Sequence, residues 1–408
     1  MTEHGLELKA RLESPLGEKV FTTIIGGVED ESRVTTRMDP WLRLLVFDMM
    51  EVGGDWEIRG TVSKSCLRNM ERFIEYWHQL LPAMCPLVKL APKEVYDDSA
   101  ETTDDGAIVP FSGGVDACYT AYRHTHHLAG HKNLDIKAAL MVHGADIPLA
   151  NQEQFDAGLR HNQEMLADLG VHKIHVIRTD YRMVGTKRYD WGAYTHMAVL
   201  IGLASFLSPL YKNVLIGSSN PYSVAPLNWG DNPVSDFMLA SRDFNVHVDD
   251  FSKHRTEKAA LLTNWKKGME KLRVCWESSL NGTNSHNCGH CEKCIRTNLN
   301  FLACGVQLPC MPVLSLKEIA ANHGEILLLR EYITLLDYAH ARNCTEPWVA
   351  VMDRKIKKYQ ARLAWPRILK RVWNKAVKIT TRWKFRHAST QKELWARRNY
   401  LRDRTIPL

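Results

Sequence analysis

Four cysteines within a window of twenty residues have the types and the spacing of a metal site. Cys288, Cys291 and Cys294 form a C-G-x-C-x-x-C array, and Cys275 lies upstream. Three thiolates at this spacing can fold around one ion while Gly289 permits the tight turn, and the upstream thiolate completes a tetrahedron. Four thiolates leave no open coordination position, so we predict a structural zinc ion rather than a catalytic one.

Other interpretations of the cysteine array stay open at this point. An iron–sulfur cluster would recruit Cys304 as well, although the spacing differs from the common bacterial run. His286 or His290 could replace one thiolate as a ligand. Reduced cysteines without a metal are the remaining alternative, which three cysteines at metal spacing disfavour.

A second chemical motif is the segment "FSGGVDA", residues 111–117. The backbone N–H groups of a glycine-rich turn and the positive end of the following helix bind anions, and Ser112 adds a hydroxyl donor. No lysine follows the glycines, which disfavours a Walker-type loop. Asp116 would repel a bare phosphate, so we expect it to ligate Mg²⁺ or to orient the loop. A turn that uses glycine only for its geometry is the alternative.

The glycine loop resembles the Ser-Gly-Gly-x-Asp-Ser signature of the PP-loop ATP pyrophosphatases, which cleave ATP between its α- and β-phosphates. Those enzymes activate a substrate as an adenylate and release pyrophosphate. Ala117 stands where the family has its second serine, which removes one hydroxyl donor to the pyrophosphate. The resemblance implies ATP as a substrate, Mg²⁺ as a cofactor and an ATP-binding loop made of Ser112, Gly113, Gly114, Val115, Asp116 and Ala117.

The cysteine array is similar to that of one PP-loop branch, the 7-cyano-7-deazaguanine synthases. There a cysteine followed by an aromatic residue precedes C-G-x-C-x-x-C-x-x-R, and together they bind zinc. Cys275-Trp276 and the run from Cys288 to Arg296 fit this pattern, with a longer insertion between the two halves. In that family the zinc holds the C-terminal part against the nucleotide-binding domain. The resemblance covers residues 106–312.

The resemblance also implies roles for later loops. Gly217, Ser218 and Ser219 follow a strand whose loop contacts the nucleotide in related enzymes, and His143 follows the strand that meets the adenosine. A plain turn and a buried histidine are the alternatives. Related enzymes keep a lysine that faces the phosphates near a later helix start. We therefore assign catalytic roles to Asp116, Arg255 and Lys258, and solvated charges on a helix are the alternative for Arg255 and Lys258.

The segment 225–236 is rich in turn-forming residues and directly follows the expected nucleotide loop. Trp229 could stack on a planar base, and Asp231 and Asp236 could accept hydrogen bonds from its N–H groups. We predict substrate contacts for these three residues. A solvent-exposed loop held down by one tryptophan is the alternative.

Alternating elements must position these motifs. Strands are expected at 107–111, 135–144, 173–180 and 213–219, with helices at 116–130, 151–170 and 193–211 between them. This alternation predicts an α/β fold with a doubly wound parallel sheet, whose ligands bind at the carboxyl ends of the strands. The loops that begin at Ser112, His143, Thr179 and Ser218 should therefore line one site.

The remaining segments suggest extensions around that sheet. We expect strands at 19–28 and 41–50, a helix at 63–84 capped by Ser63 or Ser65, and an acidic linker at 93–107. The predicted division has four parts: an N-terminal extension (1–105), a nucleotide-binding domain (106–273), a zinc-binding segment (274–312) and a helical C-terminal region (313–408).

Charge is distributed unevenly along the chain. Residues 353–408 hold 18 Lys/Arg and 3 Asp/Glu, a net of +15, whereas the rest holds 35 against 43, a net of −8. Trp365, Trp373, Trp383 and Trp395 lie among the basic residues of this tail. Such a tail suits a phosphate backbone, an anionic surface or a partner protein.

Clustered cysteines indicate a reducing compartment. The N-terminus has no apolar signal core, and the most apolar stretch, 196–207, is too short to cross a bilayer. We therefore expect a cytoplasmic protein without a membrane span, acting as a homo-oligomer or within a complex.

Together, the motifs predict an ATP-dependent ligase that adenylates a carboxylate and transfers it to a nitrogen nucleophile. The nearest substrate by resemblance is 7-carboxy-7-deazaguanine, and the acceptor is ammonia or an amine on a protein or a nucleic acid. Synthase-like proteins with such extensions also occur in bacterial antiviral defence, which makes a defence role a hypothesis. The alternatives are a tRNA-thiolating enzyme that uses Cys118 and a non-catalytic nucleotide-binding module with a structural zinc.

Overall fold

The computed structural model describes residues 5–28, 30–98, 106–275, 287–322 and 329–384. The chain divides into two compact units. Unit 1 comprises Met1–Ser315 and Asn322–Arg342, and unit 2 comprises Leu316–Ala321 and Asn343–Leu408. None of the described helices has both the length and the apolar character needed to cross a membrane.

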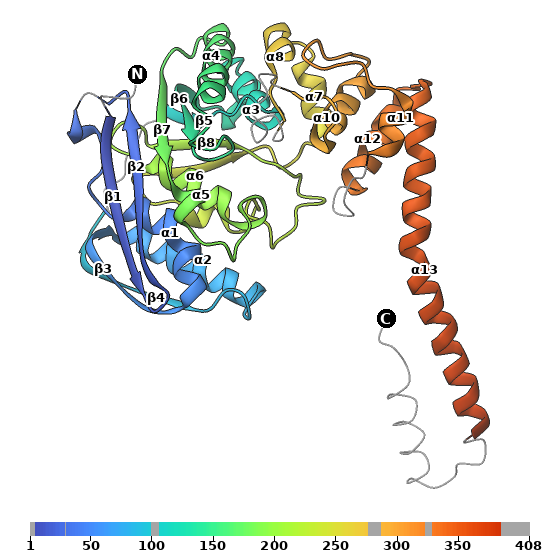
Figure 1. The fold of residues 1–408 in the computed structure, drawn as a ribbon, viewed down its shortest axis with the longest axis horizontal. Coiled ribbons are helices and arrows are strands. Elements are labelled where there is room, and N and C mark those ends of the chain that lie inside the picture. Colours follow the sequence, from blue (N-terminus) through green and yellow to red (C-terminus); the bar gives the residue numbers. More distant parts are fainter. Residues whose placement is uncertain (1–4, 29, 99–105, 276–286, 323–328, 385–408) are drawn as a thin grey trace. The chain divides into compact units, whose positions relative to one another are not determined.

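A seven-stranded sheet forms the centre of unit 1 (Figure 1). Five strands run parallel in the order β7-β6-β5-β8-β9, and β2 pairs antiparallel with β7 while β1 closes that edge. The predicted α/β class with a mostly parallel central sheet is thus confirmed. The bounds are β1 Gly5–Ser14, β2 Gly17–Gly26, β5 Gly106–Pro110, β6 Asp135–His143, β7 Ile174–Thr179, β8 Asn213–Gly217 and β9 Asn245–Asp249.

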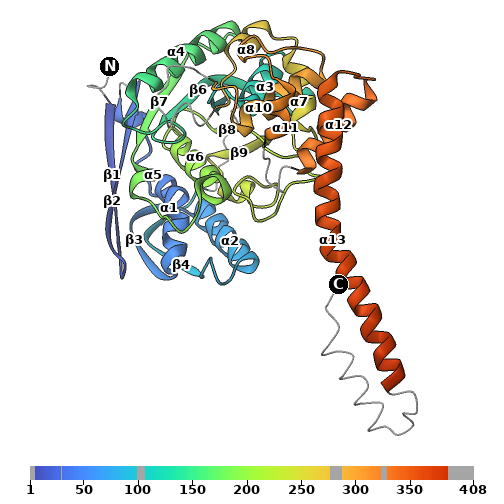
Figure 2. The ribbon, with the colours of Figure 1, turned by 45° about the vertical axis from the view of Figure 1, so that its right-hand side comes forward.

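Both faces of the central strands β5 and β8 are buried, which explains why their sequences are nearly continuously apolar. In β8, Val214 and Ile216 join one hydrophobic cluster, whereas Leu215 between them joins another. Helices α1 (Asp39–Val52), α2 (Lys64–Leu80) and α6 (His196–Ser205) supply the first cluster. Helices α3 (Val115–Thr125), α4 (Gln152–Asp168) and α7 (Arg255–Leu262) supply the second, and Figure 2 shows the two groups on opposite sides of the sheet.

The strand order has a reversal between β5 and β8. Successive crossovers from β5 place β6 and β7 on one side, and the chain then returns to place β8 and β9 on the other side. In open α/β sheets, ligands bind at the carboxyl ends of the strands at such a reversal. The loops after β5 and β8 therefore occupy the position where this architecture offers a binding site.

The strand predicted at 41–50 is wrong, because this segment lies within α1. Every residue from Trp41 to Met50 is buried, so its side chains carry no polar face that would reveal a helical period. A short, mostly apolar run, here interrupted only by the buried Arg43 and Asp48, does not distinguish a buried helix from a buried strand. Pro40 in the first turn and Gly53 at the C-cap, with φ +76°, mark the ends of the helix.

The second half of the N-terminal region agrees better with the sequence prediction. Helix α2 lies within the predicted 63–84, and the Ser63 side chain accepts a hydrogen bond from the Cys66 N–H as its N-cap. Strands β3 (Gly54–Ser63) and β4 (Val88–Tyr96) pair in parallel as a separate two-stranded sheet. The predicted linker is therefore wrong at its start, since Lys93–Tyr96 is part of β4.

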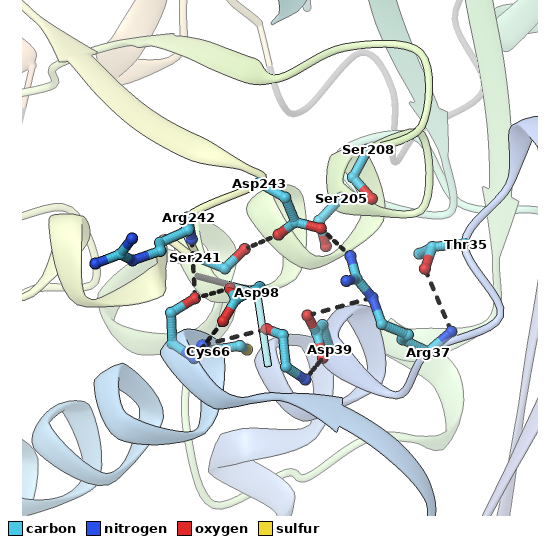
Figure 3. A network of polar contacts seen from close by, with 12 residues as sticks. Thr35, Arg37, Asp39, Cys66, Asp98, Ser205, Ser208, Ser241, Arg242 and Asp243 are labelled. Carbon is cyan, nitrogen blue, oxygen red and sulfur yellow. Dashed lines mark hydrogen bonds and ion pairs between the residues drawn. The ribbon is translucent and has the colours of Figure 1, made fainter. Parts of the chain in front are cut away.

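A polar network joins this N-terminal region to the amino ends of β8 and β9 (Figure 3). The Arg37 guanidinium pairs with Asp243, and its Nε lies 3.8 Å from an Asp39 carboxylate oxygen. The Asp98 carboxylate accepts hydrogen bonds from the backbone N–H and the hydroxyl of Ser65. A cavity of about 560 Å³ lies beside Arg37 and Asp243. This cavity therefore lies at the amino ends of β8 and β9, at the end of the sheet opposite to the loops that follow β5 and β8.

The short helix α5 (Tyr181–Val184) lies between β7 and β8. The described chain after β9 is helical in both units, and unit 1 adds α8 (Lys266–Lys271), α10 (Glu292–Ala303) and α12 (Leu329–Ala341). Unit 2 contains α11 (Leu316–Ala321) and the long helix α13 (Pro347–Lys384).

Candidate functional site

The glycine loop after β5 adopts a backbone that a side chain would disturb. Gly113 has φ +76°, and a Cβ there would lie 2.6 Å from the Asn162 Oδ1. Asn162 itself supports the loop, because its Nδ2 donates to the Phe111 carbonyl at 3.0 Å. Gly114 is the N-cap of α3, so the first N–H groups of that helix open beside the loop.

The loop after β8 meets the start of α3 at the strand reversal. A Cβ on Gly217 would lie 2.5 Å from the Asp116 carbonyl oxygen, so the two backbones touch only because residue 217 is glycine. The neighbouring Ser218 is fully buried, and its hydroxyl donates to the Asp250 carbonyl at 3.0 Å. The start of α3 and the Gly217–Ser219 segment therefore lie directly against one another.

Two cations converge on Asp116 in the first turn of α3. Arg255 Nη1 lies 2.9 Å from one carboxylate oxygen and Lys258 Nζ lies 3.2 Å from the other. Lys258 also donates to the Ser218 hydroxyl at 3.1 Å and to the Ser218 carbonyl. Both cations lie in the first turns of α7. The structure thus brings together the three predicted catalytic residues and Ser218, a predicted ATP contact.

The burial of this cluster determines its charge state. Lys258 is 0% exposed and the Arg255 side chain is 9% exposed, whereas the Asp116 side chain keeps 24% of its surface open. Burial raises the pKa of Asp116, but the charges of Lys258 and Arg255 outweigh it and hold that pKa below its usual value. The carboxylate therefore stays ionised between its two cations.

Two further basic residues lie close to this site although the sequence analysis did not select them. Burial lowers the pKa of Lys293, in the first turn of α10, while Asp146 and Asp116 act in the opposite direction and Arg255 reinforces it. The Arg273 N–H donates to the Gly113 carbonyl at 2.8 Å, which places residue 273 against the glycine loop. The sequence offered one signal for these two residues: Lys293 lies within the predicted zinc motif, and Arg273 lies just before it.

Buried carboxyl groups lie next to this cationic cluster. Asp231 accepts a hydrogen bond from the Ser219 N–H at 2.5 Å, and one oxygen of Asp231 and one of Asp236 are buried without a hydrogen-bond partner among the described atoms. Burial raises the pKa of Asp236 well above its usual value, and the neighbouring Asp231 raises it further. The two predicted substrate residues therefore form a carboxyl pair directly behind the β8 loop.

Two other predicted residues do not join these groups. His143 is fully buried, stacks on Phe155 at 4.3 Å between ring centroids, and its Nε2 lies 3.0 Å from the Pro148 carbonyl oxygen. Trp229 is half-buried, and its described hydrogen bonds are all made by its backbone: the N–H donates to the Pro226 carbonyl at 3.3 Å and the carbonyl accepts from Asn232 Nδ2. Ser112 is exposed and Val115 is buried, while Ala117 packs partly against the core beneath α3.

The four predicted cysteine ligands lie together, and their sulfurs are all within 4.8 Å of one another. Cys275 Sγ is 3.9 Å from Cys291 Sγ, and Cys288 Sγ is 3.9 Å from Cys294 Sγ. A tetrahedral zinc with Zn–S bonds of about 2.3 Å requires sulfurs roughly 3.8 Å apart, so this cluster could hold one zinc ion.

Local geometry explains how the array closes. Gly289 has φ +80°, as predicted for a tight turn, and a Cβ there would overlap the Pro312 ring. His290 is exposed and its Nδ1 lies 2.9 Å from the Cys288 carbonyl oxygen, away from the sulfurs. Cys304 instead has its sulfur 3.2 Å from the Asn300 carbonyl oxygen. His286 lies outside the described residues.

Asn287 connects the cysteine cluster to the glycine loop. Its Oδ1 accepts from the Val274 and Cys275 N–H groups at 2.9 and 3.3 Å, and its Nδ2 donates to the Leu272 carbonyl at 2.7 Å. The segment that Asn287 holds includes Arg273, whose N–H contacts the glycine loop. A metal that fixes the cysteines would thereby also fix this segment.

The alternative that requires a reactive cysteine receives no support from the environment of Cys118. This thiol is 0% exposed, and burial raises its pKa well above the ordinary value. A nucleophilic cysteine needs the thiolate and access to solvent or substrate. Cys118 therefore serves as a core residue of α3.

The site is thus a cationic cluster at a strand reversal, flanked by buried carboxyl groups and by four cysteines that could bind zinc. Comparisons with protein-family models, with curated proteins and with solved structures found no match to this chain.

Proposed function

We propose that this chain is an ATP-dependent ligase of the PP-loop type, which forms an acyl-adenylate, releases pyrophosphate and transfers the acyl group to a nitrogen nucleophile. The observation that carries the proposal is the cluster of Asp116, Arg255 and Lys258 at the first turn of α3. It lies at the loop whose sequence resembles the PP-loop signature and at the strand reversal where such sheets bind ligands.

The charges around the glycine loop support a polyphosphate ligand. Arg255 and Lys258 are two cations held by Asp116, Lys293 interacts electrostatically with Asp116 and Arg255, and the backbone of Arg273 contacts the glycine loop. Burial raises the pKa values of the nearby carboxyl pair, so that pair adds less negative charge than two free aspartates would. The surplus of positive charge and the open N–H groups at the start of α3 suit a triphosphate.

In the proposed reaction, a carboxylate oxygen of the acyl substrate attacks the α-phosphorus of ATP. The bond from that phosphorus to the oxygen bridging the β-phosphate breaks, and pyrophosphate leaves with the electron pair. A nitrogen nucleophile then attacks the acyl carbon, AMP leaves, and the nitrogen releases its proton to solvent. Arg255 and Lys258 stabilise the negative charge that develops on the pyrophosphate, and Asp116 keeps both cations oriented.

The residues present also fit the two metals. Each Asp116 oxygen accepts one hydrogen bond and retains a lone pair, so this carboxylate could hold Mg²⁺, which when bound neutralises charge on the phosphates. Zinc at the four cysteines would have a structural role, since Asn287 connects Cys275 to the segment against the glycine loop.

Buried carboxyl groups favour an acyl substrate with several N–H donors. Asp231 and Asp236 each have an oxygen without a hydrogen-bond partner among the described atoms, and Asp231 lies next to Ser219 of the β8 loop. A deazapurine such as 7-carboxy-7-deazaguanine combines N–H donors with the carboxylate that the reaction requires. We propose this compound as the first substrate to test.

The test is an incubation of the full chain with ATP, Mg²⁺, 7-carboxy-7-deazaguanine and ammonia, with AMP and pyrophosphate measured. We expect both products from the wild type and none from Lys258→Met. Lys253→Met is the matched control, because Lys253 precedes the same helix but pairs with Glu257 instead of Asp116. The absence of AMP with this and a panel of other carboxylates would overturn the ligase proposal and favour a nucleotide-binding module.

A further inference from the structure

Helix α13 of unit 2 has a very one-sided charge. Between Pro347 and Lys384 the sequence contains 12 Lys/Arg and a single acidic residue, Asp353. At a rise of about 1.5 Å per residue, this helix is roughly 57 Å long. Such a length gives a straight array of positive charge that no reaction at the glycine loop requires.

The described side chains of α13 separate into two faces. At about 100° per residue, the buried Trp348, Val349, Met352, Ile356, Val377 and Thr381 fall within one arc of roughly 100°. Five of the six exposed cations with described side chains fall on the opposite side, within an arc of roughly 140°. These five are Arg354, Lys357, Lys358, Arg362 and Lys375, whereas the exposed Lys378 lies beside the apolar arc.

Contacts inside unit 2 cover the first part of the apolar face. The Lys355 ammonium donates to the Ile319 and Ala320 carbonyls at 3.1 and 3.3 Å, which binds α13 to the C-terminal end of α11. Ile319 is itself buried, as are Met352 and Ile356. Among the described residues of unit 2, the exposed basic face is consequently the part of α13 that is available to a partner.

We propose that the basic face of α13 binds the phosphodiester backbone of a nucleic acid, independently of the reaction proposed above. Arg354, Lys358 and Arg362 are four residues apart, so they form one row with steps of about 6 Å along the helix. A duplex presents one phosphate charge per roughly 1.7 Å of its axis, which gives such a row many equivalent partners. Charge complementarity along the whole helix is the argument for this ligand.

An anionic membrane is a poorer match for the same helix. Helices that lie in a membrane interface insert a free apolar face between the lipids. In α13 the apolar side chains Val349, Met352 and Ile356 are buried, so that face is already used for packing. Among the described side chains of α13, Ile379 is the one large apolar side chain that is exposed, and a single such side chain is too little for stable insertion.

The experiment measures the binding of the full chain to a short fluorescent DNA duplex, and to the RNA duplex of the same sequence, as a function of salt. The test variant carries Arg354→Ala, Lys358→Ala and Arg362→Ala, since alanine preserves the helix. We expect binding at about 50 mM salt that weakens steeply towards 200 mM. Loss of three phosphate contacts should reduce the slope of log K against log salt by about 2.7.

A charge-matched control separates this row from net charge. Lys89, Lys137 and Lys266 are exposed in unit 1, and their replacement by alanine removes the same three charges. This control should keep the wild-type affinity and salt slope, and circular dichroism should show unchanged helix content in both variants. Failure of the wild type to bind either duplex, an unchanged slope in the α13 variant, or binding only to phosphatidylserine vesicles would each overturn the proposal.

Discussion

Replacement of Lys258 by methionine tests the reasoning about the cationic cluster most directly. Methionine has nearly the length and the volume of the lysine stem, so Lys258→Met removes the ammonium with little change in packing. The change leaves Asp116 with Arg255 as its remaining partner. It also removes the donor to the Ser218 hydroxyl and carbonyl.

The expected loss of stability follows from the distance between the two charges and from the exposure of their side chains. Charges 3.2 Å apart attract by roughly 5 kcal/mol at an effective dielectric constant of 20 and by about 1.3 kcal/mol in water. Lys258 is fully buried while Asp116 is partly open to solvent, so we expect a coupling free energy of about 2–3 kcal/mol between them. For a unit of this size, that corresponds to a decrease of about 3–4 °C in the unfolding midpoint.

The assay is a double-mutant cycle of Lys258→Met and Asp116→Asn, measured by thermal unfolding. Lys258→Met leaves Asp116 with one cation fewer, and Asp116→Asn leaves the buried Lys258 without its carboxylate. The double variant should therefore lose less stability than the sum of the two single variants. Because the folded-state pKa of Asp116 is lowered, the coupling should be complete above the ordinary carboxyl pKa and vanish as pH falls through the lowered value. Additive losses at neutral pH would refute the charge pairing described for Lys258 and Asp116.

Three further outcomes are expected. Metal analysis should find about one zinc per chain in the wild type and less in Cys291→Ser, and iron in its place would contradict the tetrahedral zinc assignment. Asp236→Asn should become increasingly more stable than the wild type as pH rises above the ordinary carboxyl pKa. The reason is that the raised pKa of folded Asp236 makes the wild type lose stability in that range. A difference in unfolding midpoint that does not depend on pH would count against this. Gly113→Ala should lower the free energy of unfolding more than Gly170→Ala does. Both glycines have φ near +77°, but of the two only Gly113 would place a Cβ against a neighbour, the Asn162 Oδ1. Equal losses in chemical denaturation would exclude that contact as a cause.

Much of the fold was predictable because its signals are local. The alternation from β5 to β8 was visible as apolar runs of strand length between helical patterns, since the central strands β5 and β8 are buried on both faces. The cysteine array was visible for a related reason, because ligands three residues apart must fold around a common point. Helix α1 was missed, since burial of Trp41 to Met50 on all sides removes the periodic polar residues that distinguish helix from strand.

Other features depend on contacts between distant residues. The hairpin β1–β2 joins the central sheet through pairs such as Thr23 with Thr179, and no local pattern in either segment specifies that partner. The contact between Arg273 and Gly113 likewise joins segments that are far apart along the chain.

The sequence by itself determined the α/β alternation, the glycine turn before a helix and the set of four cysteines, because spacing along the chain and the intrinsic geometry of glycine act over a few residues. Only the tertiary structure decided that Arg255 and Lys258 reach Asp116, since this requires β9 to pair beside β8 and so bring α7 against α3. Such a cluster depends on the packing of whole elements, which burial of two hydrophobic clusters on either side of one sheet imposes.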